Sequence, residues 1–225
     1  MERHCLKKPT VVVAGYAAWA KALVNPASQI VAALKNTQLQ SCHLKCIEVP
    51  VDTEALYTLL ERSIEEHSPD IWIGVGVAVS SPAIRLESVG INVRCFDVPD
   101  IHGRTLEPTS VVDGGPVAYQ SNFQYASVLQ ELKSHGIPAI TSFHAGTHLC
   151  NQMLYSVLHL SAQKNLELLS GFVHVPQSAE NVAQANGASA LGSSMSLVMM
   201  TKAIELCVES VVQEYVHSNN GSKIE

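Results

Sequence analysis

Cys150 is a residue whose surroundings suit nucleophilic chemistry. It follows the small-residue stretch Ala145-Gly146-Thr147 and precedes an apolar-periodic segment, so we expect it in the opening turns of a helix. The free N–H groups and the positive dipole end of a helix favour a thiolate there. Position alone is equally compatible with a buried structural cysteine, because free cysteine is among the most buried residue types.

His174 and Glu87 are the candidate partners of that cysteine. His174 lies near the end of an expected strand, just before Pro176, where it would reach a cysteine beside a neighbouring strand. Glu87 is an acid in a mostly apolar stretch, where it would orient an imidazole. Singly, a core histidine and a solvated carboxylate are the simpler explanations. Together with Cys150 they form a candidate set of nucleophile, base and orienting acid, since a thiol of ordinary pKa, about 8.5, needs such a partner to ionise.

Alternating strands and helices must position these residues. Most apolar runs are rich in Val and Ile without strict alternation, which is typical of strands buried on both faces. The expected strands are 10–14, 44–51, 70–77, 139–143 and 171–175. Helices are expected after Asn25-Pro26, after Asp52, after a capping box at 121–124 and from about 188 to 217. Open α/β sheets place their sites at the carboxyl ends of strands, so we expect Cys150 there, at the end of strand 139–143.

Composition predicts one folded domain. The chain has 225 residues, of which 47% are apolar and 15% charged, and this excludes disorder. We expect a single domain over 1–225 with frayed ends at 1–9 and 218–225. Segment 91–120 interrupts the alternation with several Pro and Gly residues, and excursions of that length are often functional.

Charge and hydropathy exclude several partners. The net charge of −6 and the absence of a basic block argue against nucleic acid. No apolar run approaches the ~18 residues that a membrane-spanning helix needs. The first residues carry positive charge with no long apolar stretch behind them, so we expect no secretory signal and a cytoplasmic location.

The cysteines and histidines predict neither disulfides nor a metal site. No two cysteines have the two-residue gap of a zinc ribbon or redox motif, and Cys42 and Cys46 around His43 lack two further ligands. His144 and His148 would join His174 near Cys150, but a stable zinc site would quench the nucleophile. We therefore expect no metal.

The segments around these residues resemble the pyroglutamyl peptidase I (pyrrolidone-carboxylate peptidase) family of cysteine peptidases. Gly136-Ile137-Pro138-Ala139 and then Ala145-Gly146-Thr147-His148-Leu149-Cys150-Asn151 are similar to the family's Gly-Ile-Pro-Ala segment and its Ala-Gly-Thr-Tyr-(Leu/Val)-Cys-Asn box. Phe172-Val173-His174-Val175-Pro176 resembles its Phe-Ile-His-Val-Pro box. Leu86-Glu87 followed by Gly90-Ile91-Asn92 resembles the stretch with the triad acid. The order and spacing of the two boxes favour the catalytic interpretation of Cys150 and His174.

The resemblance implies a fold, a reaction and a partner. The fold would be a single-domain three-layer α/β/α sandwich around a largely parallel (mixed) sheet, phosphorylase/hydrolase-like. The reaction would remove an N-terminal pyroglutamyl (5-oxoprolyl) residue from peptides through a thioester on Cys150, with His174 as acid and base and Glu87 orienting it. The resemblance also implies that no cofactor is needed, and a homo-oligomer, dimer or tetramer, is expected.

The first loop departs from the family pattern. The family follows its first strand with Gly-Phe-Glu-Pro-Phe-Gly, whereas this chain reads Gly15-Tyr16-Ala17-Ala18-Trp19-Ala20. The family's phenyl rings sandwich the lactam ring of the substrate, and Tyr16 and Trp19 keep the aromatic spacing. Phe143, which with His144 replaces a smaller polar pair, is a third expected substrate contact. Core packing is the alternative role for Tyr16 and Trp19.

Two other functions stay open at this stage. The altered loop would suit a catalytically impaired relative that binds modified peptide N-termini without turnover. Another Cys–His–Glu hydrolase, such as a glutamine amidotransferase, would carry its cysteine on a Gly-x-Cys-x-Gly elbow, which Thr147–Gln152 lacks.

Overall fold

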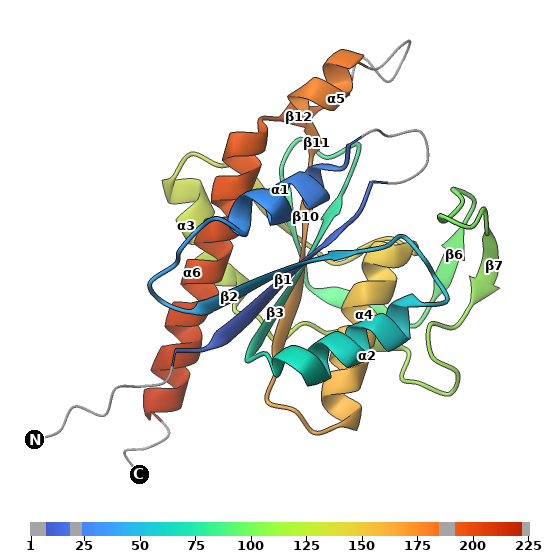
Figure 1. The fold of residues 1–225 in the computed structure, drawn as a ribbon, viewed down its shortest axis with the longest axis horizontal. Coiled ribbons are helices and arrows are strands. Elements are labelled where there is room, and N and C mark those ends of the chain that lie inside the picture. Colours follow the sequence, from blue (N-terminus) through green and yellow to red (C-terminus); the bar gives the residue numbers. More distant parts are fainter. Residues whose placement is uncertain (1–7, 19–23, 185–191, 222–225) are drawn as a thin grey trace, which may run out of the picture.

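A six-stranded mixed sheet forms the centre of the molecule (Figure 1). The computed structural model describes residues 8–18, 24–184 and 192–221. In spatial order the strands are β2 (His43–Val49), β1 (Thr10–Tyr16), β3 (Ile71–Val77), β10 (Leu169–Val175), β4 (Ile84–Glu87) and β9 (Ala139–Ser142). The first four run parallel, whereas β4 and β9 run parallel to each other and antiparallel to β10.

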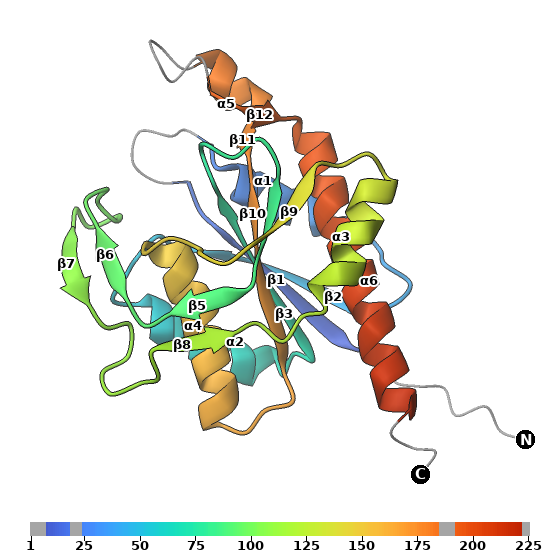
Figure 2. The same ribbon diagram turned by 180° about the vertical axis from the view of Figure 1, so that it is seen from behind.

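Helices cover both faces of this sheet, as Figures 1 and 2 show. On one face lie α1 (Pro26–Leu34), α3 (Tyr125–Ser134) and α6 (Leu197–Gly221), and on the other lie α2 (Leu56–His67) and α4 (Leu149–Gln163). Each face encloses its own cluster of buried apolar side chains. The arrangement is the expected single-domain α/β/α sandwich, which is confirmed.

Segment 91–120 is an excursion built of short strand pairs that lie over α4. Its pairs are β5 (Val89–Ile91) with β8 (Ala118–Gln120) and β6 (Arg94–Phe96) with β7 (Leu106–Thr109). The buried side chain of Asn151 fastens it, because its Oδ1 accepts from Ile91 N and its Nδ2 donates to the carbonyls of Ile91 and Val93, all at 2.9 Å. The start of α4 and this excursion therefore form one unit. A small parallel pair, β11 (Gln177–Ser178) with β12 (Ser194–Met195), and the short helix α5 (Ala179–Gln184) follow β10.

Most local expectations from the sequence are confirmed. All five expected strands form, and Asn25 caps α1 by accepting from Ala27 N at 3.0 Å with Pro26 as the first helical residue. Asp52 Oδ1 accepts from the N–H groups of Glu54 and Ala55 before α2.

Two helix boundaries differ from the expectation. The predicted capping box at 121–124 is wrong: α3 begins at Tyr125 with no side-chain cap, and Ser121 Oγ instead bonds Tyr125 Oη and the carbonyl of Ser170. The last helix begins at Leu197, after β12, and continues to Gly221, so positions 218–221 belong to a helix and are not a frayed end. Positions 1–7 and 185–191, including the expected helix start, and positions 222–225 lie outside the described residues.

The direction of β9 is also different from the expectation. Because β9 runs antiparallel to β10, its carboxyl end points away from the edge at which β3 and β10 end. The loop 143–148 returns across the sheet and brings Cys150 to that edge. The cause is β4, a strand that sequence patterning missed and that reverses the direction of the sheet between β10 and β9.

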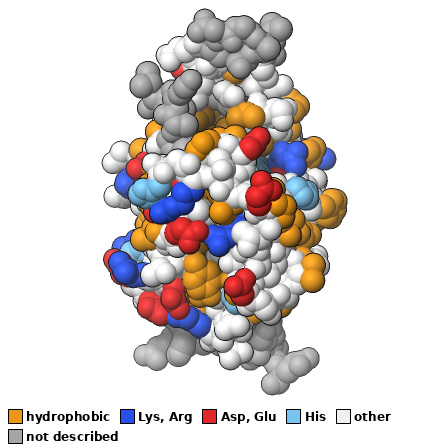
Figure 3. Space-filling model, turned by 90° about the vertical axis from the view of Figure 1, so that its right-hand side faces the viewer, with side chains coloured by type: hydrophobic (Ala, Val, Ile, Leu, Met, Phe, Trp, Pro, Cys, Tyr) orange, Lys and Arg blue, Asp and Glu red, His pale blue; other side chains and the backbone are white. Residues whose placement is uncertain are grey.

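Positive and negative side chains are intermixed on the face that carries the excursion (Figure 3). Ion pairs there join Arg94 to Glu54 at 3.2 Å and Arg104 to Asp52 at 2.9 Å, and these hold the excursion against the start of α2. Among the described helices, none has both the length and the apolar character needed to cross a membrane.

We predict that Asn151→Ala loosens the whole excursion. The change should lower the free energy of unfolding by about 2–4 kcal/mol, because three hydrogen bonds are lost and their backbone partners stay enclosed. Urea unfolding followed by circular dichroism measures this. Asn36→Ala, at an exposed position after α1, is the control and should change little. Equal stability of the two variants would show that Asn151 does not fasten the excursion.

Candidate active site

Strand register places the candidate residues in two rows across the sheet, two residues apart along the strands. The upper row holds Gly76 of β3, His174 of β10 and Arg85 of β4. The row below holds Phe172 of β10 and Glu87 of β4. Since side chains two residues apart on a strand share a face, His174, Arg85 and Glu87 all project from the face that α4 covers.

His174 and Glu87 form a buried ion pair. Nδ1 of His174 lies 2.9 Å from Oε1 of Glu87, which has no solvent exposure. A carboxylate only accepts, so Nδ1 carries the proton and Nε2 is directed to other partners. Burial raises the pKa of the Glu87 carboxyl, but hydrogen bonds from His174, Ser142 and Arg85 hold it below its ordinary value.

Cys150 is the second partner of His174. Burial lowers the pKa of His174, but the negative charge and hydrogen bonding of Cys150, together with those of Glu87, raise it to about 9. An imidazole with that pKa is mostly protonated at neutral pH. The geometry therefore places an imidazolium, backed by a carboxylate, beside the Cys150 sulfur, which is the arrangement that activates a cysteine for attack on a carbonyl.

The start of α4 leaves backbone donors beside the sulfur. His148 is the N-terminal capping residue and makes no side-chain cap hydrogen bond, and the bond from Gln152 N to the carbonyl of His148 begins the helical ladder. The first N–H groups of a helix have no partner within it. The N–H of Cys150 thus lies where an oxyanion formed on its own substrate would need a donor.

Gly76 provides the space that the sulfur occupies. A Cβ built at this position would lie 2.7 Å from Cys150 Sγ and 2.9 Å from Cζ of Phe172. Any other residue at position 76 would push the Cys150 sulfur away from its place beside His174.

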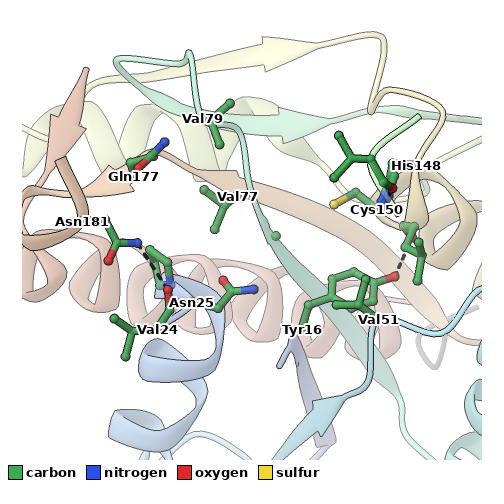
Figure 4. A pocket seen from close by; sticks show the side chains of 14 residues that line it. Tyr16, Val24, Asn25, Val51, Val77, Val79, His148, Cys150, Gln177 and Asn181 are labelled. Atoms are coloured by element: carbon green, nitrogen blue, oxygen red, sulfur yellow. Dashed lines mark hydrogen bonds between the residues drawn. The ribbon is translucent and has the colours of Figure 1, made fainter. Parts of the chain in front are cut away.

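A pocket of about 290 Å³ opens from Cys150 towards β1 and α1 (Figure 4). Cys150 and His148 lie at one end, and Gln177 and Asn181 at the other (Figure 4). Its wall is mainly apolar, and the lining side chains that reach it from the strands, loops and helix starts are Tyr16, Val24, Asn25, Pro26, Val51, Val77, Val79, Val98 and Leu149. A small, mainly apolar group would fit this space.

The three residues expected to contact the substrate lie in different places relative to the pocket. Tyr16 lines the pocket and is fixed there, since its hydroxyl donates to the carbonyl of Leu149 at 2.5 Å. Trp19 lies outside the described residues. Phe143 does not line the pocket: its side chain is 73% exposed, because it leaves the carboxyl end of the antiparallel edge strand β9.

The neighbouring histidines have other partners. Nε2 of His148 lies 3.0 Å from the carbonyl of Val98, and its ring packs on Phe96 with centroids 4.3 Å apart, so it ties the excursion to the pocket wall. His144 accepts a hydrogen bond from Gly146 N. Across residues 8–18, 24–184 and 192–221, no three His, Cys, Asp or Glu side chains are arranged to hold a metal ion.

Sequence reasoning missed two residues of this site. Gly76 alternates with Gly74 within a strand otherwise made of Val, Ile and Trp, and a glycine inside a buried strand indicates a close approach. Arg85 is a cation in the short, otherwise apolar run before Glu87. The strand β4 that contains it was too short to recognise by pattern.

The α/β/α fold and the Cys–His–Glu geometry define the class of the protein as a cysteine-type hydrolase. Within that class, the chain belongs to the pyroglutamyl peptidase family, whose sequence model matches residues 9–214. It is 32% identical to the pyrrolidone-carboxylate peptidase of Pyrococcus furiosus over 204 residues, which covers 91% of this chain and 98% of that protein. It is also 32% identical to the Brevibacillus brevis enzyme of the same name, over 203 residues that cover 90% and 93% of the two chains.

Solved structures agree with the sequence comparison. The crystal structure of the pyrrolidone carboxyl peptidase from Fervidobacterium islandicum matches with a TM-score of 0.87 at 33% identity, covering 90% of this chain and 97% of that one. A variant of the Pyrococcus furiosus enzyme matches with a TM-score of 0.88 at 32% identity, covering 92% and 99%. The fold is therefore shared over nearly the whole of each chain.

We predict that Gly76→Ala displaces the nucleophile without unfolding the protein. Iodoacetamide labelling of Cys150, followed by mass mapping, should slow by about tenfold or more, because the sulfur leaves its imidazole partner. Labelling of the half-buried Cys95 in the same sample should stay unchanged and serves as the internal control. Undiminished labelling of Cys150 would mean that the space at Gly76 does not position the sulfur.

Proposed function

We propose that this protein is a cysteine omega-peptidase that removes an N-terminal pyroglutamyl (5-oxoprolyl) residue from peptides. The observation that carries the proposal is the line Cys150–His174–Glu87 at one end of a small, mainly apolar pocket. The names of the relatives, pyrrolidone-carboxylate peptidases, support the choice of substrate.

Acylation would begin at the sulfur. The Cys150 thiolate attacks the carbonyl carbon of the pyroglutamyl residue, and the oxygen takes the negative charge beside the first N–H groups of α4. As the tetrahedral intermediate collapses, the C–N bond breaks and His174 gives its Nε2 proton to the leaving amine. A pyroglutamyl thioester on Cys150 and a peptide shortened by one residue result.

Deacylation would use the same residues in reverse. His174, now neutral, takes a proton from water, and the hydroxide formed attacks the thioester. Collapse of the second intermediate releases pyroglutamate and restores the thiolate and imidazolium. Throughout, Glu87 keeps the proton of His174 on Nδ1, so that Nε2 faces the reaction.

The pocket suits a lactam better than an amino acid with a free amine. The pyroglutamyl ring is flat and uncharged, and it would lie against apolar side chains such as Val51, Val77 and Val98, with Tyr16 beside them. Its N–H and carbonyl need polar partners, and the described part of the wall offers the amide side chains of Asn25, Gln177 and Asn181. A prolyl residue has the same ring size but a charged amine, which would lose its hydration there and meet no carboxylate among the described lining residues.

A binding protein without turnover is the alternative that the sequence left open. The site argues against it, because a non-catalytic binder has no use for a buried carboxylate that orients a histidine next to a cysteine. The altered loop after β1 is its sole support, and Tyr16 within that loop still lines the pocket.

We predict selective cleavage of pyroglutamyl substrates. The unmodified protein should release aminomethylcoumarin from its pyroglutamyl amide and show at least a ~100-fold lower kcat/KM on the prolyl amide, because the polar partners of the lactam carbonyl would stay unsatisfied. Cys150→Ser should abolish nearly all turnover while its circular dichroism matches that of the unmodified protein.

The contrary result is clear-cut. Equal cleavage of the prolyl and pyroglutamyl amides would contradict the proposed specificity. Turnover that survives in Cys150→Ser would contradict the assignment of the nucleophile. Tight binding of a pyroglutamyl peptide without any cleavage would favour the non-catalytic alternative.

A further inference from the structure

Arg85 occupies an unusual place next to the candidate triad. Its Nε donates to Oε1 of Glu87 at 3.0 Å, and the same oxygen accepts from Nδ1 of His174 at 2.9 Å. Two cationic groups thus share one carboxylate oxygen. A guanidinium cannot lose its charge in a protein, whereas the imidazole must do so once in each catalytic cycle.

The guanidinium is held firmly in this position. Its Nη2 donates to Oγ of Ser142 at 2.6 Å and to the carbonyl of His144 at 3.3 Å. Ser142 is the register partner of Glu87 on β9, and His144 lies in the loop that leads to Cys150. Arg85 therefore links the strand of the acid to the segment that carries the nucleophile, and its own side chain is 31% exposed.

We propose that Arg85 is a positioning residue that keeps Glu87 a carboxylate aimed at His174 while His174 is neutral; this inference rests on the proposed function. When His174 has given its proton to the leaving amine, the ring is neutral and Glu87 no longer has the positive charge of the imidazolium beside it. A fully enclosed carboxylate without a cation would take up a proton from solvent; Glu87 would then donate to Nδ1, and the proton of His174 would sit on Nε2 instead. With Arg85 in place Glu87 stays ionised, so Nδ1 keeps its proton and Nε2 stays able to accept one from water.

No other group described around His174 supplies a permanent positive charge beside Glu87. Cys150 of α4 and Glu87 of β4 are the anions that act on it, and Arg85 is the cation on its far side. The nearby phenols are neutral over the range of an assay: burial raises the pKa of Tyr16 and of Tyr125, whose hydroxyl donates to the backbone carbonyl of Glu87. Arg85 is thus the permanent positive charge of the cluster among the described residues.

The sign of the effect on pH dependence follows from the charges. A nearby cation favours the thiolate and disfavours the imidazolium. Removing the cation therefore favours the protonated form of both groups. The negative charge of Glu87, no longer offset by Arg85, also favours the protonated form of His174. His174, whose pKa is raised to about 9, should therefore lose its proton at higher pH, so we expect the alkaline limb of turnover to move up and the pH profile of Cys150 alkylation to move with it.

The test compares Arg85→Gln, Arg85→Lys and Arg62→Gln. In Arg85→Gln we expect kcat on the pyroglutamyl amide to fall about 10- to 100-fold with KM changed less than about twofold. Losses of activity of that size are typical when a group that orients a functional histidine from behind is removed, as is known for the histidine ligands of metal enzymes. Both pH profiles should move to higher pH. Arg85→Lys keeps the charge without the fork, so its profiles should match those of the unmodified protein while kcat is only partly restored. Arg62, exposed on α2, is the matched control and should change nothing.

The alkylation profile separates this inference from the proposed function. Labelling of Cys150 by iodoacetamide needs no substrate, so it reports the charge of Arg85 even if the pyroglutamyl amide proves to be no substrate. Unmoved alkylation and turnover profiles in a folded Arg85→Gln protein would overturn the inference. An inactive unmodified protein whose alkylation profile still moves in Arg85→Gln would overturn the proposed function and leave the role of Arg85 standing.

Discussion

A carboxylate buried without solvent contact is the constraint on which the rest of this structure depends. Glu87 lies in the sheet under His174, and its charge is stabilised there because His174 Nδ1 and Arg85 Nε both donate to its Oε1. This demand explains the short strand β4, which reverses the direction of the sheet to bring Glu87 beneath His174 and Arg85 beside it. It also explains the loop 143–148, which must return across the sheet to bring Cys150 beside His174.

The fold meets this demand with rigid elements on every side. Gly76 makes room for the sulfur, and Asn151, one residue after Cys150, fastens the excursion that closes the pocket wall. Because α4 both presents the nucleophile and anchors the excursion, a shift of that helix would alter the attack geometry and the pocket together. Preorganisation of this kind lets a modest thiol–imidazole pair act without rearrangement during the reaction.

Part of this architecture is predictable from the sequence, and the reasons are physical. Buried parallel strands and capped helices carry strong local patterns, so β1, β3, β10 and α1 were recognisable, and the boxes around Cys150 and His174 identified the family. The direction of β9 was not, because it depends on the four-residue strand β4, whose partners are distant in the sequence. The exposure of Phe143, at the end of β9, follows from the same reversal. The place of Arg85 beside Glu87 and Ser142 could not be predicted from its neighbours in the sequence, because it depends on the register of β4 with β10 and β9.

The central claim is that His174 is an imidazolium at neutral pH because Cys150 and Glu87 beside it raise its pKa. Nitrogen NMR of ¹⁵N-histidine-labelled protein tests this directly. The account predicts that both ring nitrogens of His174 carry protons at neutral pH, that the ring titrates with a midpoint of about 9, and that this midpoint falls in Cys150→Ala because the anion is gone. A His174 that is already neutral at neutral pH, or one whose midpoint ignores the loss of Cys150, would contradict it.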